Sequence, residues 1–143
     1  MDDDRAIVYI HFANLFSWLR RDEEGFYYLV DRKKDMIKTG GENVYAQEVE
    51  DVLRNHPAVF DCALIGVEDD RFGEAVAAAI VLNEGCELSD EELIAYCRQN
   101  LPSYKKPRYV AFVDDLPHNV TGKIQKSVLR ENSDRLFRPV RGL

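Results

Sequence analysis

Three apolar runs of strand length are the strongest pattern in this chain. Residues 59–67 and 75–82 are almost wholly apolar, and the charged loop 68–74 separates them. Residues 109–113 form a third run of the same kind. Short apolar runs bounded by polar turn residues are typical of strands in the core of a domain. The pattern therefore predicts three central strands.

A helical spacing of apolar residues precedes these runs and predicts a helix from Tyr45 to Asn55. Its apolar face is expected to comprise Val49, Val52 and Leu53. Its polar face is expected to comprise Glu48, Glu50 and Asp51. His56-Pro57 ends this helix, because the residue before a proline disfavours the helical conformation. We interpret His56 as a capping or surface residue and not as a metal ligand.

A capping box at Ser89, in which serine is followed three residues later by glutamate, predicts the start of a second helix. This helix is expected to extend through Gln99. Leu93, Tyr96 and Cys97 form its expected buried stripe. Cys97 is therefore predicted to be a core residue and not a nucleophile.

Near the N-terminus the sequence predicts a β-hairpin. Asp22-Glu23-Glu24-Gly25 is a turn signal, Phe26 to Val30 indicate a strand, and Met36-Ile37 are expected as its return strand. A last short helix follows Gly122. The element order predicts a small α+β domain, with a three-stranded sheet, covering helices and an N-terminal hairpin. The inner face of the last helix is expected to comprise Ile124, Val128 and Leu129.

Composition and charge limit the class of protein. A length of 143 residues, with 45% hydrophobic and 31% charged residues, is typical of one soluble globular domain. No apolar run approaches the roughly 20 residues that span a bilayer. The net charge of −7 argues against a general nucleic-acid binder, because such proteins usually present a basic surface. Many basic residues nevertheless gather within 32–38, 105–108 and 123–130, a distribution that suits a small polyanion.

The cysteines and histidines predict neither a disulfide framework nor a metal centre. Cys62, Cys86 and Cys97 are far apart and odd in number. A reducing, cytoplasmic setting is the simplest inference from this usage. The histidines are also scattered, so the spacing of a zinc site is absent from the sequence.

The stretch from Asp31 to Gly41, Asp-Arg-Lys-Lys-Asp-Met-Ile-Lys-Thr-Gly-Gly, is the first candidate for chemistry. Four basic residues precede a Gly-Gly pair, between a predicted strand and a predicted helix. Cationic side chains and accessible backbone N–H groups at a glycine turn are able to hold phosphates. A solvated hairpin whose lysines only maintain solubility explains the same residues equally well.

Lys123 is the second candidate, in the stretch Leu116-Pro-His-Asn-Val-Thr-Gly-Lys-Ile124. The Thr121-Gly122 pair makes a tight exposed turn that projects the next side chain outward. A lysine there is able to stabilise charge that develops on phosphate or carboxylate oxygens during a reaction. The alternative is a solvated lysine near a helix N-terminus, where the macrodipole makes a positive charge slightly unfavourable. We interpret His118, in the same turn, as a surface residue.

Together, the two stretches resemble motifs of a known family. Residues 31–45, followed by Glu48-Val49-Glu50, are similar to the hinge motif of the adenylate-forming enzymes, which include acyl-CoA synthetases, luciferases and peptide-synthetase adenylation domains. Asn119 to Ile124 is similar to the C-terminal lysine motif of that superfamily. The resemblance extends from about residue 22 to residue 131 and covers only the small C-terminal domain. The wording is most similar to fatty-acid or other acid–CoA ligases.

The resemblance implies a role for each matching residue. In this family a large N-terminal domain binds ATP and a carboxylic acid, and the small domain closes over it in two orientations. The first orientation forms an acyl-adenylate, and in the second a thiol such as CoA attacks it. By resemblance, Lys123 contacts the acyl and phosphate oxygens in the first orientation. Lys34 matches the hinge residue, Arg32 matches an arginine that contacts ATP, and Gly40 and Gly41 match the glycine pair along the pantetheine tunnel.

Phe72, Tyr104 and Lys106 match positions that stack on or pair with the CoA nucleotide in some CoA ligases. The resemblance implies ATP with Mg²⁺ and CoA as substrates of the complete enzyme, with neither bound tightly by this chain alone. The expected partner is the large N-terminal adenylation domain, in cis or in trans. Without that domain the chain is expected to be inactive.

Parts of the chain depart from the family pattern. Residues 1–21 do not resemble it, 22–133 are the expected domain, and 134–143 are expected as a tail. Ser17 stands where the aspartate that binds ribose belongs. These departures support a different hypothesis, a free-standing, non-catalytic binding or interaction module. In that case residues 7–19 would cover the surface that otherwise faces the large domain, or would pair two copies into a homodimer.

Overall fold

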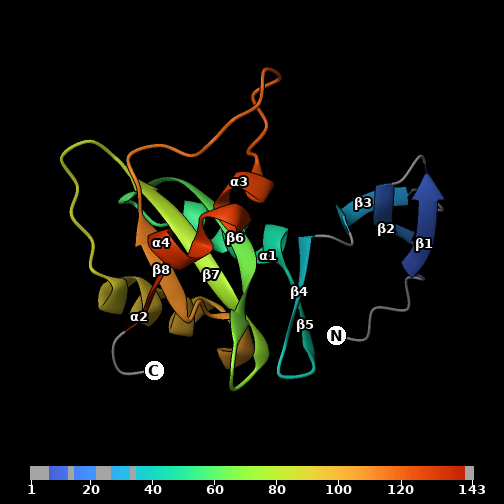
Figure 1. Ribbon diagram of the computed structural model, residues 1–143, viewed down its shortest axis with the longest axis horizontal. Helices are drawn as coiled ribbons and strands as arrows, with labels where there is room; N and C mark the ends of the chain where they lie inside the picture. Colours follow the sequence, from blue (N-terminus) through green and yellow to red (C-terminus); the bar gives the residue numbers. More distant parts are fainter. Residues whose placement is uncertain (1–6, 13–14, 22–26, 33–34, 141–143) are drawn as a thin grey trace.

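The computed structural model describes residues 7–12, 15–21, 27–32 and 35–140, with side chains placed from residue 35 onward. The chain has an α+β fold, which confirms the class predicted from the sequence (Figure 1). The elements have the following bounds: β1 Ile7–Phe12, β2 Leu15–Arg21, β3 Tyr27–Arg32, β4 Met36–Thr39, β5 Glu42–Tyr45, α1 Ala46–Arg54, β6 Val59–Asp69, β7 Gly73–Leu82, α2 Asp90–Asn100, a 3₁₀ helix Ser103–Lys105, β8 Tyr109–Phe112, α3 Lys126–Glu131, α4 Ser133–Leu136 and β9 Arg138–Pro139.

The central sheet has the strand order β6-β7-β8-β9. Strands β6 and β7 form a long antiparallel hairpin, β7 and β8 are parallel, and β8 and β9 are antiparallel. Parallel neighbours need a crossover, and α2 lies in the connection between β7 and β8. The three apolar runs are β6, β7 and β8, so the prediction of three central strands is confirmed.

Helices cover both faces of this sheet, which explains why β7 is apolar at nearly every position. Alternate residues of a strand point to opposite faces. Val76, Ala78 and Ile80 therefore pack in one core with residues of α1 and α2, whereas their neighbours in β7 pack in a second core with α3. The second core contains Ala63, Ile65, Ala77, Ala79, Val81, Ala111, Leu116, Leu129 and Phe137.

Helix α1 confirms the predicted helix but presents a different face to the core. Ala46, Val49, Glu50 and Leu53 are buried, in the i, i+3, i+4, i+7 spacing of one helical face. The expectation that Glu50 lies on the polar face is wrong, because its residue is only 4% exposed. Its carboxylate has polar partners there, which are described below. Val52, expected on the apolar stripe, is half-buried.

Helix α2 begins with the predicted capping box. The Ser89 hydroxyl accepts a hydrogen bond from the Glu92 backbone N–H at 3.1 Å and donates one to the Glu92 carboxylate at 3.2 Å. The first of these bonds gives the Glu92 N–H a partner, which N–H groups in the first turn of a helix otherwise lack. Cys97 is fully buried, as predicted.

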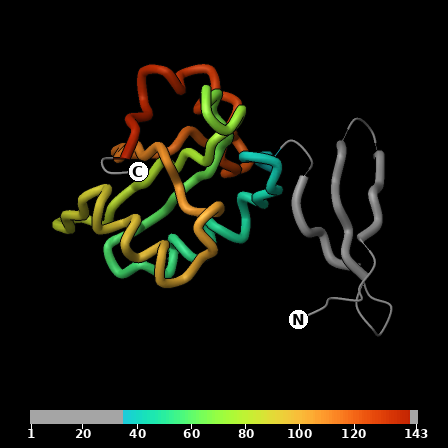
Figure 2. The backbone as a smooth tube through the Cα atoms, turned by 90° about the horizontal axis from the view of Figure 1, so that it is seen from below, coloured from blue at the N-terminus to red at the C-terminus, as the bar shows by residue number. Residues whose placement is uncertain are grey.

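The predicted pairing of the N-terminal hairpin is wrong. Strand β3 pairs antiparallel with β2, and β4 pairs with β5 instead of returning along β3. The cause is the Gly40-Gly41 turn, where both residues have positive φ, 55° and 85°. Two positive φ angles in succession close a two-residue hairpin, so β4 folds onto β5. In Figures 1 and 2 this β4–β5 ribbon lies at one side of the central sheet, and the loop between β7 and α2 lies at the other.

The C-terminal part of the described chain contributes to the domain core. Phe137 and Val140 are 6% and 5% exposed, and β9 adds an edge to the central sheet. Helix α3 begins at Lys126, after an irregular stretch that follows Gly122. Leu129 faces the core as predicted, but Val128 is 36% exposed, so that part of the expected inner face is wrong. Leu129 is the one buried residue of this short helix.

Candidate functional site

Lys123 lies near the tip of a loop that projects from the domain between β8 and α3 (Figure 1). The arms of this loop pair with each other. The Asn119 N–H donates to the Lys123 carbonyl at 2.8 Å, and the Gln125 N–H donates to the Pro117 carbonyl at 2.7 Å. His118, which is exposed as predicted, forms an isolated bridge with Ile124. The loop is therefore a small two-armed ribbon that we call the Lys123 loop, residues 117–125.

The Asn119 side chain organises the tip of the Lys123 loop. Its Oδ1 atom accepts hydrogen bonds from the Thr121 N–H at 3.0 Å, the Thr121 hydroxyl at 2.7 Å and the Lys123 N–H at 2.9 Å. Gly122 has φ of 84°, a conformation that a side chain would strain. The sequence prediction of a tight, exposed Thr-Gly turn is confirmed. Lys123 is exposed, and within 35–140 no hydrogen bond or ion pair to its ammonium group is formed.

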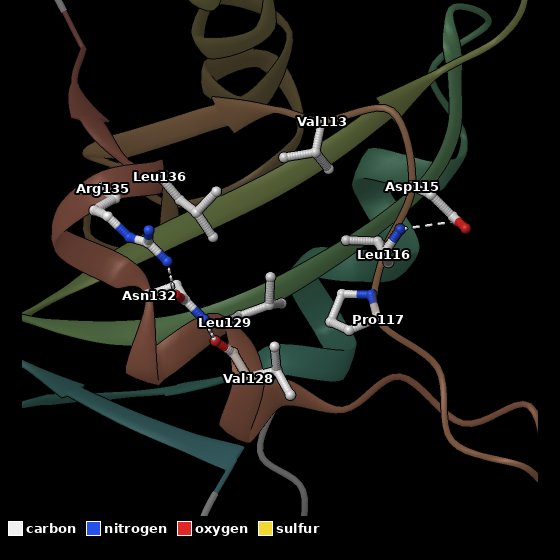
Figure 3. A pocket seen from close by; sticks show the side chains of 9 residues that line it. All are labelled: Val113, Asp115, Leu116, Pro117, Val128, Leu129, Asn132, Arg135 and Leu136. Atoms are coloured by element: carbon white, nitrogen blue, oxygen red, sulfur yellow. Dashed lines mark hydrogen bonds between the residues drawn. The ribbon is translucent and has the colours of Figure 1, made fainter.

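An open apolar groove of about 660 Å³ lies where the two arms of the Lys123 loop meet the domain (Figure 3). Leu116 and Pro117 approach it from the incoming arm, and Val128 and Leu129 approach it from α3. Leu116 and Leu129 are buried in the second core. Among the described residues, the hydrogen bonds of the loop tip lie within the loop, whereas its base packs against the domain.

The Gly40-Gly41 turn forms a second candidate site, together with the turn between β6 and β7. The Gly40 N–H donates to the Phe72 carbonyl at 3.1 Å. A Cβ atom on Gly40 would lie 3.1 Å from a carbon of the Phe72 ring. The ring and the glycine backbone are thus in close contact, so Phe72 and Gly40, both predicted site residues, are brought together.

Cationic groups surround Phe72. The Arg108 guanidinium lies 4.0 Å from the ring centroid and that of Arg71 lies 5.1 Å away. Burial, and then the neighbouring charges of Arg98 and Arg108, lower the pKa of Lys106. No carboxylate of the described residues is among the causes of that shift. The Asp69 carboxylate partly balances this charge, since Arg108 is among the causes that lower its pKa. The remaining positive charge of Arg98, Lys106 and Arg108 favours an anionic ligand.

Tyr104 extends this basic surface. Tyr104 is 40% exposed, and the Lys105 ammonium lies 5.6 Å from the centroid of the Tyr104 ring. Lys105 also forms an ion pair with Glu48 of α1 at 2.6 Å. We call Gly40, Gly41, Phe72, Tyr104, Lys106 and Arg108 the glycine-turn face.

The Lys123 loop and the turns that carry the glycine-turn face lie at opposite ends of the domain formed by residues 35–140. In Figure 1 the loop between β8 and α3 projects from one end, whereas the β4–β5 and β6–β7 turns lie at the other. The two predicted sets of site residues are therefore not assembled into one site.

The hinge and ATP-contact candidates fall at the edge of the described part of the chain. Lys34, the predicted hinge residue, lies outside the described residues. Arg32 ends β3, but nothing is described of its side chain. His56, predicted as a capping or surface residue, is half-buried in the turn after α1, where its Nδ1 atom accepts the Ala58 N–H at 3.0 Å.

Sequence reasoning missed two residues. Glu50 was assigned to the wrong face, although its spacing from Ala46, Val49 and Leu53 was a signal of burial. Arg108 was counted only in a basic group, and its contact with Phe72 depends on the nonlocal pairing of β7 with β8. Within the described part of the chain, no cluster of His, Cys, Asp or Glu is arranged to hold a metal ion. No described helix has the length and apolar character needed to cross a membrane.

Comparison with known proteins identifies the fold. The family model of the AMP-binding enzyme C-terminal domain matches residues 48–123, more than half of the chain and up to Lys123 itself. The chain belongs to this family. The adenylate-forming resemblance predicted from the two motifs is therefore confirmed.

Relatives of this AMP-binding enzyme C-terminal domain are named as CoA ligases. The putative acyl-CoA synthetase YngI of Bacillus subtilis is 47% identical over 116 residues, which is 81% of this chain and 21% of that protein. A crotonobetaine/carnitine–CoA ligase of Salmonella arizonae is 46% identical over 110 residues, 77% of this chain and 21% of that protein. The chain spans about one fifth of the length of the curated relatives it matches.

Solved structures show the same domain within larger chains. A Mycobacterium tuberculosis fatty acyl CoA synthetase is 44% identical, with a TM-score of 0.72 over 81% of this chain and 23% of its own. ATP-bound MatB from Rhodopseudomonas palustris is 31% identical, with a TM-score of 0.81 over 92% of this chain and 31% of its own. The structural similarity therefore extends beyond the segment that the sequence relatives match.

Proposed function

We propose that this chain acts as the C-terminal domain of an ATP-dependent acid–CoA ligase. In this proposal it supplies Lys123 for acyl-adenylate formation and the glycine-turn face for thioester formation. The observation that carries the proposal is the placement of these two sets of residues at opposite ends of one domain (Figure 1). A domain with two working ends needs two orientations against its partner, one for each step.

Lys123 acts in the first step by electrostatic stabilisation. Its exposed ammonium group, held out by the Asn119-centred turn, meets the negative charge that develops as the carboxylate attacks the α-phosphate of ATP. Charge stabilisation of this kind is strongest where water is excluded, which requires closure against a partner surface. Removing one such group typically costs about 3 kcal/mol in the step that it serves.

The glycine-turn face acts in the second step by binding CoA. Gly40 and Gly41 carry no side chains, so a pantetheine arm is able to pass along the turn. The exposed Tyr104 ring offers a face to the adenine base, and Phe72 lines the same site with Arg108 over its ring. Lys106 and Arg108 offer charges to the phosphates of CoA. We propose Lys34 as the hinge between the two orientations and Arg32 as an ATP contact, both on the basis of the motif resemblance alone.

The proposed partner is a large N-terminal adenylation domain, in cis or in trans. The proposal is supported by the relatives, in which the matched segment is about one fifth of a longer protein. The substrates of the complete enzyme would be ATP with Mg²⁺, a carboxylic acid and CoA. We expect the metal to enter with the nucleotide and to bind on the larger domain.

Thioester formation by the reconstituted enzyme tests this proposal. The chain is mixed with, or fused to, the N-terminal domain of a matching acid–CoA ligase, and acyl-CoA is measured. We expect activity with the wild-type chain and a loss of about a hundredfold with Lys123→Ala. An unaffected Lys123→Ala variant would refute the assignment of Lys123.

Calorimetry with CoA, ATP and AMP separates this proposal from the interaction-module hypothesis. We expect weak CoA binding that decreases further in Lys106→Ala. The matched control is Arg135→Gln, which removes an exposed positive charge on α4, away from the glycine-turn face, and is expected to leave CoA binding unchanged. A chain that binds none of the three nucleotides and elutes as a dimer would favour the interaction module instead.

A further inference from the structure

A largely buried ion pair joins α3 to α1 at the base of the Lys123 loop. The Glu50 side chain is 6% exposed and the Lys126 side chain is 15% exposed, and the Glu50 Oε2 atom lies 3.2 Å from the Lys126 ammonium nitrogen. Lys126 is the first residue of α3 and follows Lys123 by three positions. The ion pair therefore lies at the base of the loop that carries the proposed reactive lysine.

The Glu50 carboxylate also fills a second role in the fold. The same Oε2 atom accepts a hydrogen bond from the Leu64 backbone N–H at 2.9 Å. Leu64 belongs to β6, the edge strand of the central sheet. Because an edge strand lacks a neighbour on one side, this carboxylate satisfies an N–H group that the sheet leaves unpaired. Glu50 thus connects the sheet, α1 and α3 at one atom.

A second ion pair is formed one helical turn further along α3. The Arg130 guanidinium lies 3.3 Å from the Asp35 carboxylate, with side-chain exposures of 34% and 17%. Lys126 and Arg130 are four residues apart, so they share one face of α3. Asp35 immediately precedes β4. Two acids, one on α1 and one at the start of β4, therefore hold the two cations of one helical face.

Stability alone does not account for burying this pair. Replacing a buried ion pair by apolar side chains of similar size is often neutral or stabilising, because each charge loses its hydration on burial. A lysine at the N-terminal end of a helix is also on the unfavourable side of the macrodipole. What the pair does supply is direction, since a charged hydrogen bond tolerates fewer geometries than an apolar contact.

We propose that Glu50 and Lys126 are positioning residues that set the direction of the Lys123 loop relative to the domain. Within the described part of the chain, the hydrogen bonds of the loop tip are internal to the loop, so we expect the tip to move as a unit about its base. A rotation of α3 would displace Lys123 with it. This inference rests on the proposed function of Lys123 only for its consequence in catalysis, because the geometry stands without it.

The decisive variant combines Glu50→Gln with Lys126→Met. The introduced glutamine keeps an acceptor for the Leu64 N–H, and methionine keeps nearly the length of the lysine side chain without its charge. Glu48→Gln is the matched control, because it breaks the Glu48–Lys105 pair on the same helix, away from the Lys123 loop. Urea denaturation measures stability, and residual dipolar couplings of residues 119–125 measure the direction of the loop relative to the sheet.

We expect the combined variant to unfold at nearly the wild-type urea concentration but to have altered couplings for residues 119–125. We also expect the order parameters of the loop to fall from about 0.85 toward about 0.6. The Glu48→Gln control should keep wild-type couplings. If the combined variant does not fold, Glu50→Gln with Lys126→Leu, which also leaves no buried charge unpaired, gives the same readout. Wild-type couplings in the folded variant would overturn the inference.

The reconstituted ligase supplies a separate readout of the catalytic consequence. The combined variant should slow acyl-adenylate formation about tenfold or more, since small misplacements of a reacting group are costly, and should leave transfer from preformed adenylate to CoA within about twofold. If Lys123→Ala does not slow adenylation, the proposed function of Lys123 fails. The residual dipolar couplings then still test the positioning role of Glu50 and Lys126 independently. If Lys123→Ala slows it and the couplings are unchanged, only the positioning role fails.

Discussion

The Glu74 carboxylate occupies the space directly over Gly66. The two residues are diagonal neighbours on one face of the β6–β7 hairpin, because Gly66 pairs with Val76. A Cβ atom on Gly66 would lie 2.5 Å from the Glu74 carboxyl carbon. In this position Glu74 accepts a hydrogen bond from the Lys38 backbone N–H at 3.0 Å. The missing side chain of Gly66 thus allows β7 to hold β4, the strand that leads into the Gly40-Gly41 turn.

We predict that Gly66→Ala destabilises the domain through Glu74. The new methyl group forces the carboxylate aside, and the Lys38 N–H loses its acceptor. The expected cost is about 1 kcal/mol in the free energy of unfolding, measured by urea denaturation. In a Glu74→Ala background the same substitution should cost almost nothing, because there is no carboxylate to displace. An equal cost in both backgrounds would contradict the explanation.

The sequence was sufficient for elements whose signals are local. The capping box at Ser89 predicted the start of α2, and the apolar runs predicted β6, β7 and β8. The sequence did not predict the partner of β4, because that pairing depends on the turn that joins β4 to its neighbour. The stretch that ends in Gly40-Gly41 is interpreted from sequence as a phosphate candidate or a solvated hairpin, but neither interpretation pairs β4 with β5 across the two positive φ angles.

Tyr109 and Asp69 provide a test by pH. The Tyr109 hydroxyl donates to the Asp69 carboxylate at 2.8 Å. This hydrogen bond raises the pKa of Tyr109 and lowers the pKa of Asp69. The acid contributes stability above its unfolded pKa of about 4 and loses it as the pH falls through the lower folded value. The phenol contributes below its unfolded pKa of about 10 and loses stability as the pH rises through the higher folded value.

We therefore predict that Tyr109→Phe lowers the free energy of unfolding by a constant amount between about pH 5 and pH 9. The cost should be below about 1 kcal/mol, because the carboxylate lies near solvent and its interactions are screened. The difference between variant and wild type should shrink toward either extreme of pH. Urea denaturation across this range measures it, and a cost that grows steadily with pH would contradict the assignment.

The three cysteines should differ sharply in reactivity. Burial raises the pKa of Cys62 to about 12 and that of Cys97 to about 11. Cys86 is exposed. Because the thiolate is the reactive form, we predict that a disulfide reagent labels one thiol per folded chain near pH 8 and three after unfolding. Cys86→Ser should abolish labelling of the folded chain, and rapid labelling of that variant would show that the core opens.

The candidate site was predictable in its chemistry and not in its arrangement. Motif spacing selected Lys123 and the Gly40-Gly41 pair, but nothing local indicated that they lie at opposite ends of the domain. The contact of Arg108 with Phe72 and the pairing of Glu50 with Lys126 both join distant parts of the chain. Such contacts depend on the completed sheet, which fixes where each turn and helix lies.

A comparison of the two half-reactions tests the central claim most directly. The chain, joined to the large domain of a matching ligase, is assayed for acyl-adenylate formation and, separately, for transfer of a preformed acyl-adenylate to CoA. The account predicts that Lys123→Ala slows the first step about a hundredfold and changes the second by less than about twofold. Equal losses in both steps, or none in the first, would contradict the claim that Lys123 and the glycine-turn face serve different steps.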